Sequence, residues 1–226
     1  MIIPTQINLK YLIVGTGRCG TVSVSKLLTN VGIPCGHESI FDSNGIEEAI
    51  NRIKSNSPKQ SYTSSRDGWK QPEKIIAESS YMAVPYLGHP ILKKSKIIHI
   101  VRNPLEVVSS FIYGANHFQG IDYVKEWDDF IETHLPEINN FKTPIEKAVY
   151  YYVAWNRKIN ADMFHKIEDG YLELLKKMNL KIENVSYSEK ANHFIRNKSI
   201  SLKDIPKGQL KKDFLKLSEE YGYVLR

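Results

Sequence analysis

Residues 10–28, KYLIVGTGRCGTVSVSKLL, bring a strand, a glycine-rich turn and a helix together without a break. Residues 10–14 are apolar and β-prone, and the three glycines between positions 15 and 20 allow the backbone to approach a ligand closely. After Thr21 the apolar side chains recur at i, i+3, i+4 and i+7, which is the spacing of a helix with one buried face. Because the first N–H groups of such a helix are unpaired and its dipole is positive there, the stretch predicts a site for a phosphorylated nucleotide.

The length and composition bound the class of protein. A chain of 226 residues with ordinary globular composition is long enough for one α/β domain and too short to promise two. We therefore expect a single domain over residues 1–226. The 31 basic and 25 acidic side chains give a formal net charge of +6, which suits an anionic cofactor but is too small to indicate nucleic-acid binding.

The apolar pattern and the cysteines predict the cellular compartment. No apolar stretch approaches the roughly 20 residues of a membrane span, and the first residues lack the pattern of a secretory signal. A disulfide at Cys19, inside the glycine turn, would obstruct a ligand, so Cys19 and Cys35 are expected to be reduced. We therefore expect a cytoplasmic protein without a membrane span.

Strands and helices alternate along the rest of the chain. Strands are expected near 33–38, 74–77, 96–101 and 163–167, and helices around 46–53, near 82–92, and over 105–113, 144–160, 171–178 and 203–221. This alternation predicts a three-layer α/β/α fold with a central, mainly parallel sheet. Ligands of such folds bind at the carboxyl ends of the strands, where the glycine turn and Arg102 would both lie.

The glycine turn fits two common nucleotide motifs incompletely. GTGRCG matches the G-x-G-x-x-G dinucleotide fingerprint, and Glu38 lies 18 residues after Gly20, near where a ribose-binding acid is expected. The next strand is short and broken by Pro34 and Gly36, so an NAD(P)-dependent oxidoreductase is kept only as an alternative. A phosphate-binding loop of the NTPase type needs a lysine after its last glycine, whereas the cation of this turn is Arg18, inside it.

The segment Arg18-Cys19-Gly20-Thr21 resembles the 5′-phosphosulfate loop of sulfotransferases that use 3′-phosphoadenylyl sulfate (PAPS). The resemblance implies a P-loop NTPase-like sulfotransferase fold and transfer of the sulfuryl group of PAPS to a hydroxyl, with PAP as product and no metal. Arg18 would then offer a planar fork to the transferring sulfonate, whose charge changes in the transition state. The implied cofactor contacts of the loop are those of Gly17, Arg18, Cys19, Gly20, Thr21 and Val22.

A second motif, IIHIVRNPLEVVSSF, carries the other half of the resemblance. A strand ends at Arg102 and Ser110 follows eight residues later on a helix, which resembles the way the sulfotransferase family holds the 3′-phosphate of PAPS. An ion pair between Arg102 and Glu106, with a solvent-facing serine, is the structural alternative. The basic third cofactor loop of many family members has only two candidate residues, Arg196 and Lys198.

The acceptor side is predicted from IPCGHE at residues 33–38. This segment resembles the region where tyrosylprotein sulfotransferases carry Arg-Cys-Gly-Glu-Glu, with a glutamate as the base. By this resemblance Glu38 is the candidate catalytic base, and Arg18 is the other candidate catalytic residue. The neighbouring His37 is the alternative candidate for the base. A strand-end carboxylate that pairs with a lysine is the alternative for Glu38. The acceptor is expected to carry a hydroxyl on a carbohydrate, a small molecule or a protein, and a non-catalytic nucleotide-binding module is the non-enzyme alternative.

Overall fold

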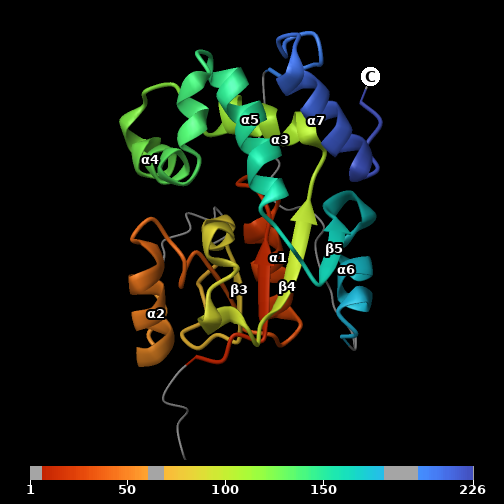
Figure 1. Cartoon of the computed structure of the whole chain (residues 1–226). Coiled ribbons are helices and arrows are strands. Elements are labelled where there is room, and N and C mark those ends of the chain that lie inside the picture. Colours follow the sequence, from red (N-terminus) through yellow and green to blue (C-terminus); the bar gives the residue numbers. More distant parts are fainter. Residues whose placement is uncertain (1–6, 61–68, 181–197, 226) are drawn as a thin grey trace, which may run out of the picture.

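The computed structural model describes residues 7–60, 69–180 and 198–225. Its centre is one sheet of five strands in the order β2-β3-β1-β4-β5 (Figure 1), and every neighbouring pair is parallel. The strands are β1 (Tyr11–Val14), β2 (Cys35–His37), β3 (Ala77–Ser79), β4 (Lys96–Val101) and β5 (Met163–Lys166). The chain leaves β1 toward one edge of the sheet and later crosses to the other, so β1 ends where ligands of such sheets bind.

Seven α-helices accompany the sheet in the described ranges. They are α1 (Thr21–Asn30), α2 (Gly45–Ser55), α3 (Pro104–Ser109), α4 (Lys125–His134), α5 (Pro144–Arg157), α6 (Tyr171–Lys177) and α7 (Gln209–Glu220). A 3₁₀ segment, η1 (Tyr81–Tyr86), follows β3, and a π-helical turn, η3 (Ser110–Gly114), continues α3. In Figure 1 α3, α4, α5 and α7 gather beyond the arrowhead of β4, so this helical layer lies over the carboxyl ends of the strands.

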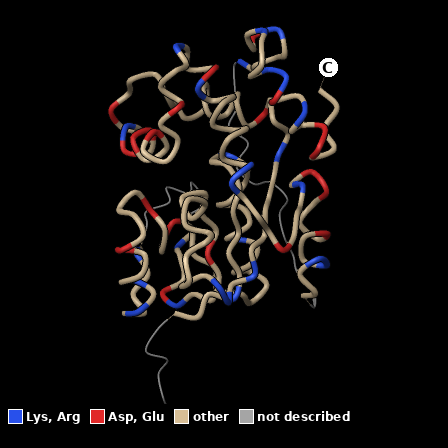
Figure 2. Tube along the Cα trace, in the orientation of Figure 1, with Lys and Arg blue, Asp and Glu red and all other residues tan. Residues whose placement is uncertain are grey.

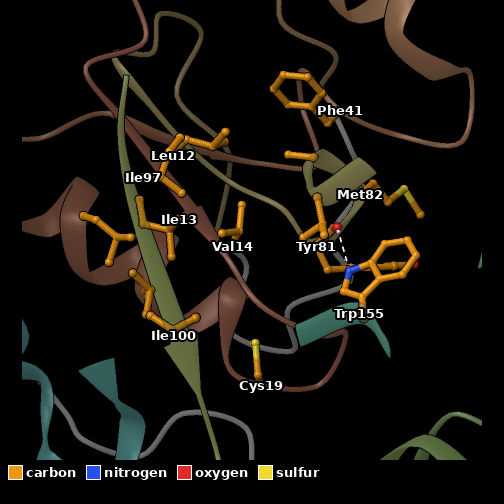
Figure 3. Close-up of a cluster of buried hydrophobic side chains, with 14 of the residues drawn as sticks. Leu12, Ile13, Val14, Cys19, Phe41, Tyr81, Met82, Ile97, Ile100 and Trp155 are labelled. Atoms are coloured by element: carbon orange, nitrogen blue, oxygen red, sulfur yellow. Dashed lines mark hydrogen bonds between the residues drawn. The ribbon is translucent and has the colours of Figure 1, made fainter. Parts of the chain in front are cut away.

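The strands β1 and β4 are largely apolar runs buried on both faces, as is typical of parallel sheets. All four residues of β1 are buried, and β1 pairs with β4 from Tyr11 opposite Lys96 to Val14 opposite His99. Figure 3 shows this core extending from the sheet to the helical layer, where Trp155 of α5 donates from Nε1 to the Tyr81 carbonyl at 3.2 Å. The sheet and the helices above it therefore share one packed interior.

These elements confirm the predicted α/β class and its parallel sheet, and they correct several boundaries. The strand expected at 74–77 lies at Ala77–Ser79, where a buried Glu78 hides the apolar pattern of a strand. The helix expected near 82–92 is instead two 3₁₀ segments, because Pro85 and Pro90 interrupt it.

Two helices differ from expectation in the second half of the chain. The helix expected over 203–221 begins only at Gln209, directly after Gly208. The helix α4 was not predicted, because its apolar residues are few and stand among acidic ones. Its acidic residues are Glu126, Asp128, Asp129 and Glu132, and they give α4 the concentration of negative charge that Figure 2 shows on that side of the helical layer.

Membrane crossing needs a long apolar helix. No helix within the described ranges has both the length and the apolarity to cross a bilayer.

Candidate active site

The glycine turn connects the carboxyl end of β1 to α1. Arg18 and Gly20 both have positive φ values, of 68° and 107°, so the backbone folds back sharply before the helix begins at Thr21. A Cβ atom at Gly15 would lie 2.4 Å from the Ile100 carbonyl oxygen, so only glycine fits there. The left-handed backbone conformation of Arg18 is strained for a non-glycine residue, and strain of this kind is frequent at functional sites.

The N-terminus of α1 carries no side-chain cap, because its N-cap residue is Gly20. Uncapped N–H groups at a helix N-terminus form an anion site. Earlier N–H groups of the turn are engaged within the protein: that of Gly17 donates to the Tyr151 hydroxyl at 2.7 Å, and that of Cys19 to the Thr16 carbonyl at 3.4 Å. In this conformation the N–H groups of Gly17 and Cys19 are therefore not available to an anion.

Arg18 joins the two sequence motifs. Its Nε donates to Ser110 Oγ at 3.1 Å, although 92 positions separate the two residues. Ser110 opens the η3 turn, and a Cβ atom at Gly114, which ends that turn, would lie 3.8 Å from Arg18 Nη2. The fold thus brings together one residue from each of the two motifs that carry the sulfotransferase resemblance.

Arg102 also lies at the carboxyl ends of the strands, directly after β4. Its Nη2 is 3.4 Å from Glu106 Oε2, so the ion pair considered above as the structural alternative is present. The two side chains are 28% and 45% exposed, and a pair in such a setting is worth at most about 1 kcal/mol. A phosphate carries more charge than Glu106, so it can replace that carboxylate as the partner of Arg102.

The thiol in the glycine turn is not a nucleophile. Cys19 and Cys35 are both free and buried. Burial raises the pKa of Cys19 to about 12, an effect that Arg102 opposes only in part, so the thiol stays protonated at neutral pH. Its sulfur packs beneath the turn (Figure 3), which makes Cys19 a core residue whose backbone belongs to the loop.

Glu38 leaves the end of β2 in the left-handed region, with φ of 52°. The neighbouring strand β3 holds this turn through Glu78, a fully buried carboxylate. Glu78 accepts from the N–H groups of Ser39 and Ile40 at 2.7 and 2.9 Å and from the Ser39 hydroxyl at 2.7 Å. A Cβ atom at Gly36 would lie 2.3 Å from Glu78 Oε2, so the glycine before His37 makes room for the clamp.

His37 lies next to Glu38 at the end of β2, and the two would form an ion pair only with the imidazole protonated. The Ser79 carbonyl lies 2.8 Å from His37 Nδ1, which places the ring hydrogen on that nitrogen and leaves Nε2 3.5 Å from Glu38 Oε1. No lysine pairs with Glu38 in the part of the chain that the structure describes. The lysine pair considered as the alternative for Glu38 is therefore absent there.

The candidate base and the candidate transition-state residue lie at the same end of the sheet. Glu38 follows β2 and Arg18 follows β1, and both strands run in the same direction. Tyr81, the first residue of η1, follows β3 at this end and is buried. Burial raises the pKa of its phenol, Glu38, Tyr151 and Asp128 raise it further, and Arg18 lowers it.

Sequence reasoning missed Tyr151 and Glu78. Tyr151 stands in an aromatic run that predicts core packing, and it is buried, but its spacing does not reveal that its hydroxyl accepts from Gly17. Glu78 did offer a signal, because a carboxylate in a buried strand needs hydrogen-bond partners. Burial still raises the pKa of Glu78, although its three hydrogen bonds favour the charged form.

The remaining predicted residues have no role that the geometry fixes. Val22 is half-buried in the first turn of α1, and Lys198 is exposed. Arg196 lies outside the described residues. Among the residues that are described, no group of three or more His, Cys, Asp and Glu side chains is placed to hold a metal ion.

Comparison with protein-family models identifies the family of the chain. The family model described as "Sulfotransferase domain" covers residues 9–186, a span that includes the glycine turn, Glu38 and the Arg102–Ser110 motif. No curated protein sequence matches the chain. The matched span is well over half of the 226 residues, and the parallel five-stranded sheet agrees with the predicted sulfotransferase fold. The chain belongs to the sulfotransferase family.

Proposed function

We propose that this protein transfers the sulfuryl group of PAPS to a hydroxyl acceptor and releases PAP. The observation that carries the proposal is the 3.1 Å hydrogen bond from Arg18 Nε to Ser110 Oγ. It connects the loop that the family resemblance assigns to the 5′-phosphosulfate with the helix that it assigns to the 3′-phosphate. A direct contact between these two elements suits a nucleotide with anionic groups at both the 3′ and the 5′ position of its ribose. The cytoplasmic location expected from the sequence stays a prediction.

On the donor side, Arg102 and Ser110 would bind the 3′-phosphate. The uncapped start of α1 and the Thr21 hydroxyl would bind the 5′-phosphate, with contacts from the backbone of Gly17, Cys19, Gly20 and Val22. The engaged N–H groups of Gly17 and Cys19 would have to change partners to contribute. Arg18 would neutralise charge on the departing phosphate oxygen, and no metal enters the scheme.

On the acceptor side, Glu38 would act as the base. As the acceptor oxygen bonds to sulfur, the bond from sulfur to the bridging oxygen of PAPS breaks and the acceptor proton passes to Glu38. His37 would position Glu38, because the Ser79 carbonyl fixes the ring and Nε2 faces Glu38 Oε1. The Glu78 clamp would hold both residues at the sheet edge.

The donor proposal is tested by calorimetric titration with PAP, ADP and NAD side by side. We expect PAP to bind at least tenfold more tightly than ADP, since Arg102 adds a charge-assisted contact of about 1.5–3 kcal/mol to the 3′-phosphate. Arg102→Ala should remove this preference, and Arg157→Ala, on the solvent side of α5, should keep it. Equal binding of PAP and ADP, or tighter binding of NAD, would favour the oxidoreductase alternative.

Catalysis is tested separately from binding. Glu38→Gln keeps the size of the side chain and removes the base, so PAP should bind as before while PAPS-dependent turnover falls about 100-fold or more. Glu219→Gln, on the exposed end of α7, is the matched control and should retain turnover. A wild-type protein that binds PAP but transfers sulfuryl to none of a panel of sugars, phenols and alcohols would support the non-catalytic binding module.

A further inference from the structure

The strand β3 separates the two strands that lead to the proposed catalytic residues. Arg18 follows β1 and Glu38 follows β2, and the strand order β2-β3-β1 places β3 between them. Neighbouring strands of a sheet lie about 4.8 Å apart, so β1 and β2 are separated by roughly 10 Å. Both strands pair with β3 in the described sheet, so the position of the base relative to the donor loop depends on β3.

Ser79, the last residue of β3, contacts both sides of the proposed site. Its hydroxyl donates to the carbonyl of Thr21, the first residue of α1, at 2.9 Å. Its own carbonyl accepts from His37 Nδ1 at 2.8 Å. All three residues are buried, and Ser79 has no exposed surface. Both contacts are therefore direct, and they are shielded from the water that would weaken them.

On one side the contacts lead from Ser79 to the candidate base. His37 Nε2 lies 3.5 Å from Glu38 Oε1, and the backbone N–H of His37 donates to Gln71 Oε1 at 2.7 Å. Ser79 thus holds the ring of His37 while Gln71 holds its backbone. The Glu38 side chain is 19% exposed, so it is supported from the sheet and still open to an acceptor.

On the other side the contact leads to the donor loop. The helix α1 begins at Thr21 without a side-chain cap, and the proposed function assigns its first N–H groups and the Thr21 hydroxyl to the 5′-phosphate. The Ser79 hydroxyl bonds the carbonyl of that same residue, so it holds the start of the helix against β3. A shift of this contact would therefore shift the bound donor.

The residues on either side of Ser79 fix the end of β3 to both neighbouring strands. The buried carboxylate of Glu78 accepts from the Ser39 N–H, in the turn after β2, at 2.7 Å. The N–H of Ser80 donates to the carbonyl of Ile13 in β1 at 3.0 Å. Ser79 is thus held on a backbone that is anchored on both sides, so its two contacts define one separation between helix and base.

We infer that Ser79 is a positioning residue of sulfuryl transfer, which sets the distance between the donor loop and the base Glu38 through Thr21 on one side and His37 on the other. This inference rests on the proposed function. Sulfuryl transfer needs the attacking oxygen, the sulfur and the leaving oxygen in line, and a misplacement of about 1 Å costs on the order of 100-fold in rate. A residue that fixes this alignment affects the rate of transfer more than the binding of the nucleotide.

The test is a double-mutant cycle of Ser79→Ala with Glu38→Gln. The rate is single-turnover release of PAP from PAPS with the best acceptor from the panel of sugars, phenols and alcohols. Ser79→Ala removes the bond to Thr21 and keeps the carbonyl that His37 uses. We expect it to lower the rate roughly 10- to 100-fold while the Kd for PAP changes less than about threefold. In the Glu38→Gln protein the same change should cost less than about threefold, because no base is left to align.

Ser25→Ala is the matched control for folding. Ser25 lies one turn further along α1, is as fully buried as Ser79, and donates to the Cys35 carbonyl of β2 at 2.7 Å. Its loss removes the same kind of bond away from the glycine turn, so the rate should stay near that of the wild type. Ser79→Thr keeps a hydroxyl and should retain most of the rate. If Ser79→Ala does not fold, His37→Phe interrupts the same path on its other side and should show the same dependence on Glu38.

The outcomes separate the inference from the proposed function. An unchanged rate in Ser79→Ala, an equal loss with and without Glu38, or an equal loss in Ser25→Ala would each overturn the positioning role of Ser79. A wild-type protein that does not bind PAP or transfers no sulfuryl group, or a Glu38→Gln protein with full turnover, overturns the proposed function instead.

Discussion

Arg18 combines a left-handed backbone with a side chain that reaches the second motif. The φ value of 68° costs on the order of 1–3 kcal/mol for a non-glycine residue, and the rest of the fold must offset this cost. The guanidinium is thereby fixed 3.1 Å from Ser110 before any ligand binds. A charged group held in this way acts mainly on the charge that develops during the reaction.

Arg18→Ala should therefore lower turnover far more than affinity. We expect kcat with PAPS to fall roughly 100- to 1,000-fold, as for other preorganised charge-stabilising groups, while the Kd for PAP changes less than tenfold. Single-turnover kinetics and calorimetry on the same preparation measure the two effects. Arg52→Ala is unsuitable as a control because Arg52 is buried against Asp42, whereas Arg157→Ala removes a surface arginine and should change neither quantity. Equal losses in both quantities would make Arg18 a binding residue only.

Among the elements, β4 carries a buried histidine that links stability to pH. Burial lowers the pKa of His99 from 6.5 to about 4, although its hydrogen bond to Asn156 favours the charged form. Between these two pKa values the unfolded chain binds more protons than the folded one. The free energy of unfolding is therefore highest above pH 6.5 and decreases as the pH falls toward 4. The difference in unfolding free energy is on the order of 3 kcal/mol.

Urea unfolding at pH 7 and pH 5 measures this dependence. His99→Gln keeps a hydrogen-bonding side chain opposite Asn156 and should flatten the fall in stability between the two pH values. His89→Gln replaces a half-buried histidine whose Nδ1 accepts from the Ile91 N–H, so it changes the overall stability but should leave the fall between the two pH values as in the wild type. The same pH dependence in His99→Gln and the wild type would show that His99 is not its source.

The helix α5 supports the glycine turn through one hydroxyl. Tyr151 is 1% exposed and accepts from the Gly17 N–H at 2.7 Å. Tyr151→Phe leaves that buried N–H without an acceptor, which costs about 1–3 kcal/mol of folding stability. Tyr152→Phe is the matched control, because the neighbouring hydroxyl is buried with no hydrogen-bond partner among the described residues, and its loss should be neutral or stabilising. Equal destabilisation by the two changes would contradict a supporting role for Tyr151.

The elements also show what sequence patterns can and cannot predict. The strands β1 and β4 and the Arg102–Ser110 spacing were predicted because their signals are local: an apolar run and two polar residues on one strand–helix unit. The helix α4 was missed because its buried residues, Asp128, Phe130 and Ile131, include a carboxylate. The sequence does not single out His117, because its contact with Asp128 forms only when α4 folds against the loop that precedes it, and no local pattern encodes that contact.

At the scale of the whole molecule, hydrogen bonds connect the site to the C-terminal segment of the described chain. Glu168, after β5, accepts from the Asn103 N–H next to Arg102 at 2.7 Å and from the Tyr223 hydroxyl at 2.6 Å. Tyr223 lies beyond α7, and the Lys166 ammonium nitrogen lies 4.7 Å from the centre of its ring. Residues that follow β1 and β4 thus meet residues of α5 and of the C-terminal segment at the carboxyl ends of the strands. A ligand bound there should therefore stabilise the fold as a unit.

PAP should therefore raise the melting temperature of the whole protein in a single transition. At a free PAP concentration of 100 times its Kd, binding adds about 2.7 kcal/mol, which for a chain of this size corresponds to a shift of roughly 5–10 °C. Because the shift depends on the 3′-phosphate, Arg102→Ala should lose most of it at the same PAP concentration, and ADP should give a smaller shift than PAP in the wild type. Glu168→Gln weakens the link to Asn103 and Tyr223 without touching the nucleotide, so it should lower the melting temperature yet retain the PAP-induced shift. An Arg102→Ala protein with the full shift would remove Arg102 from the nucleotide site, and two separate transitions would show that the strand layer and the helical layer unfold independently.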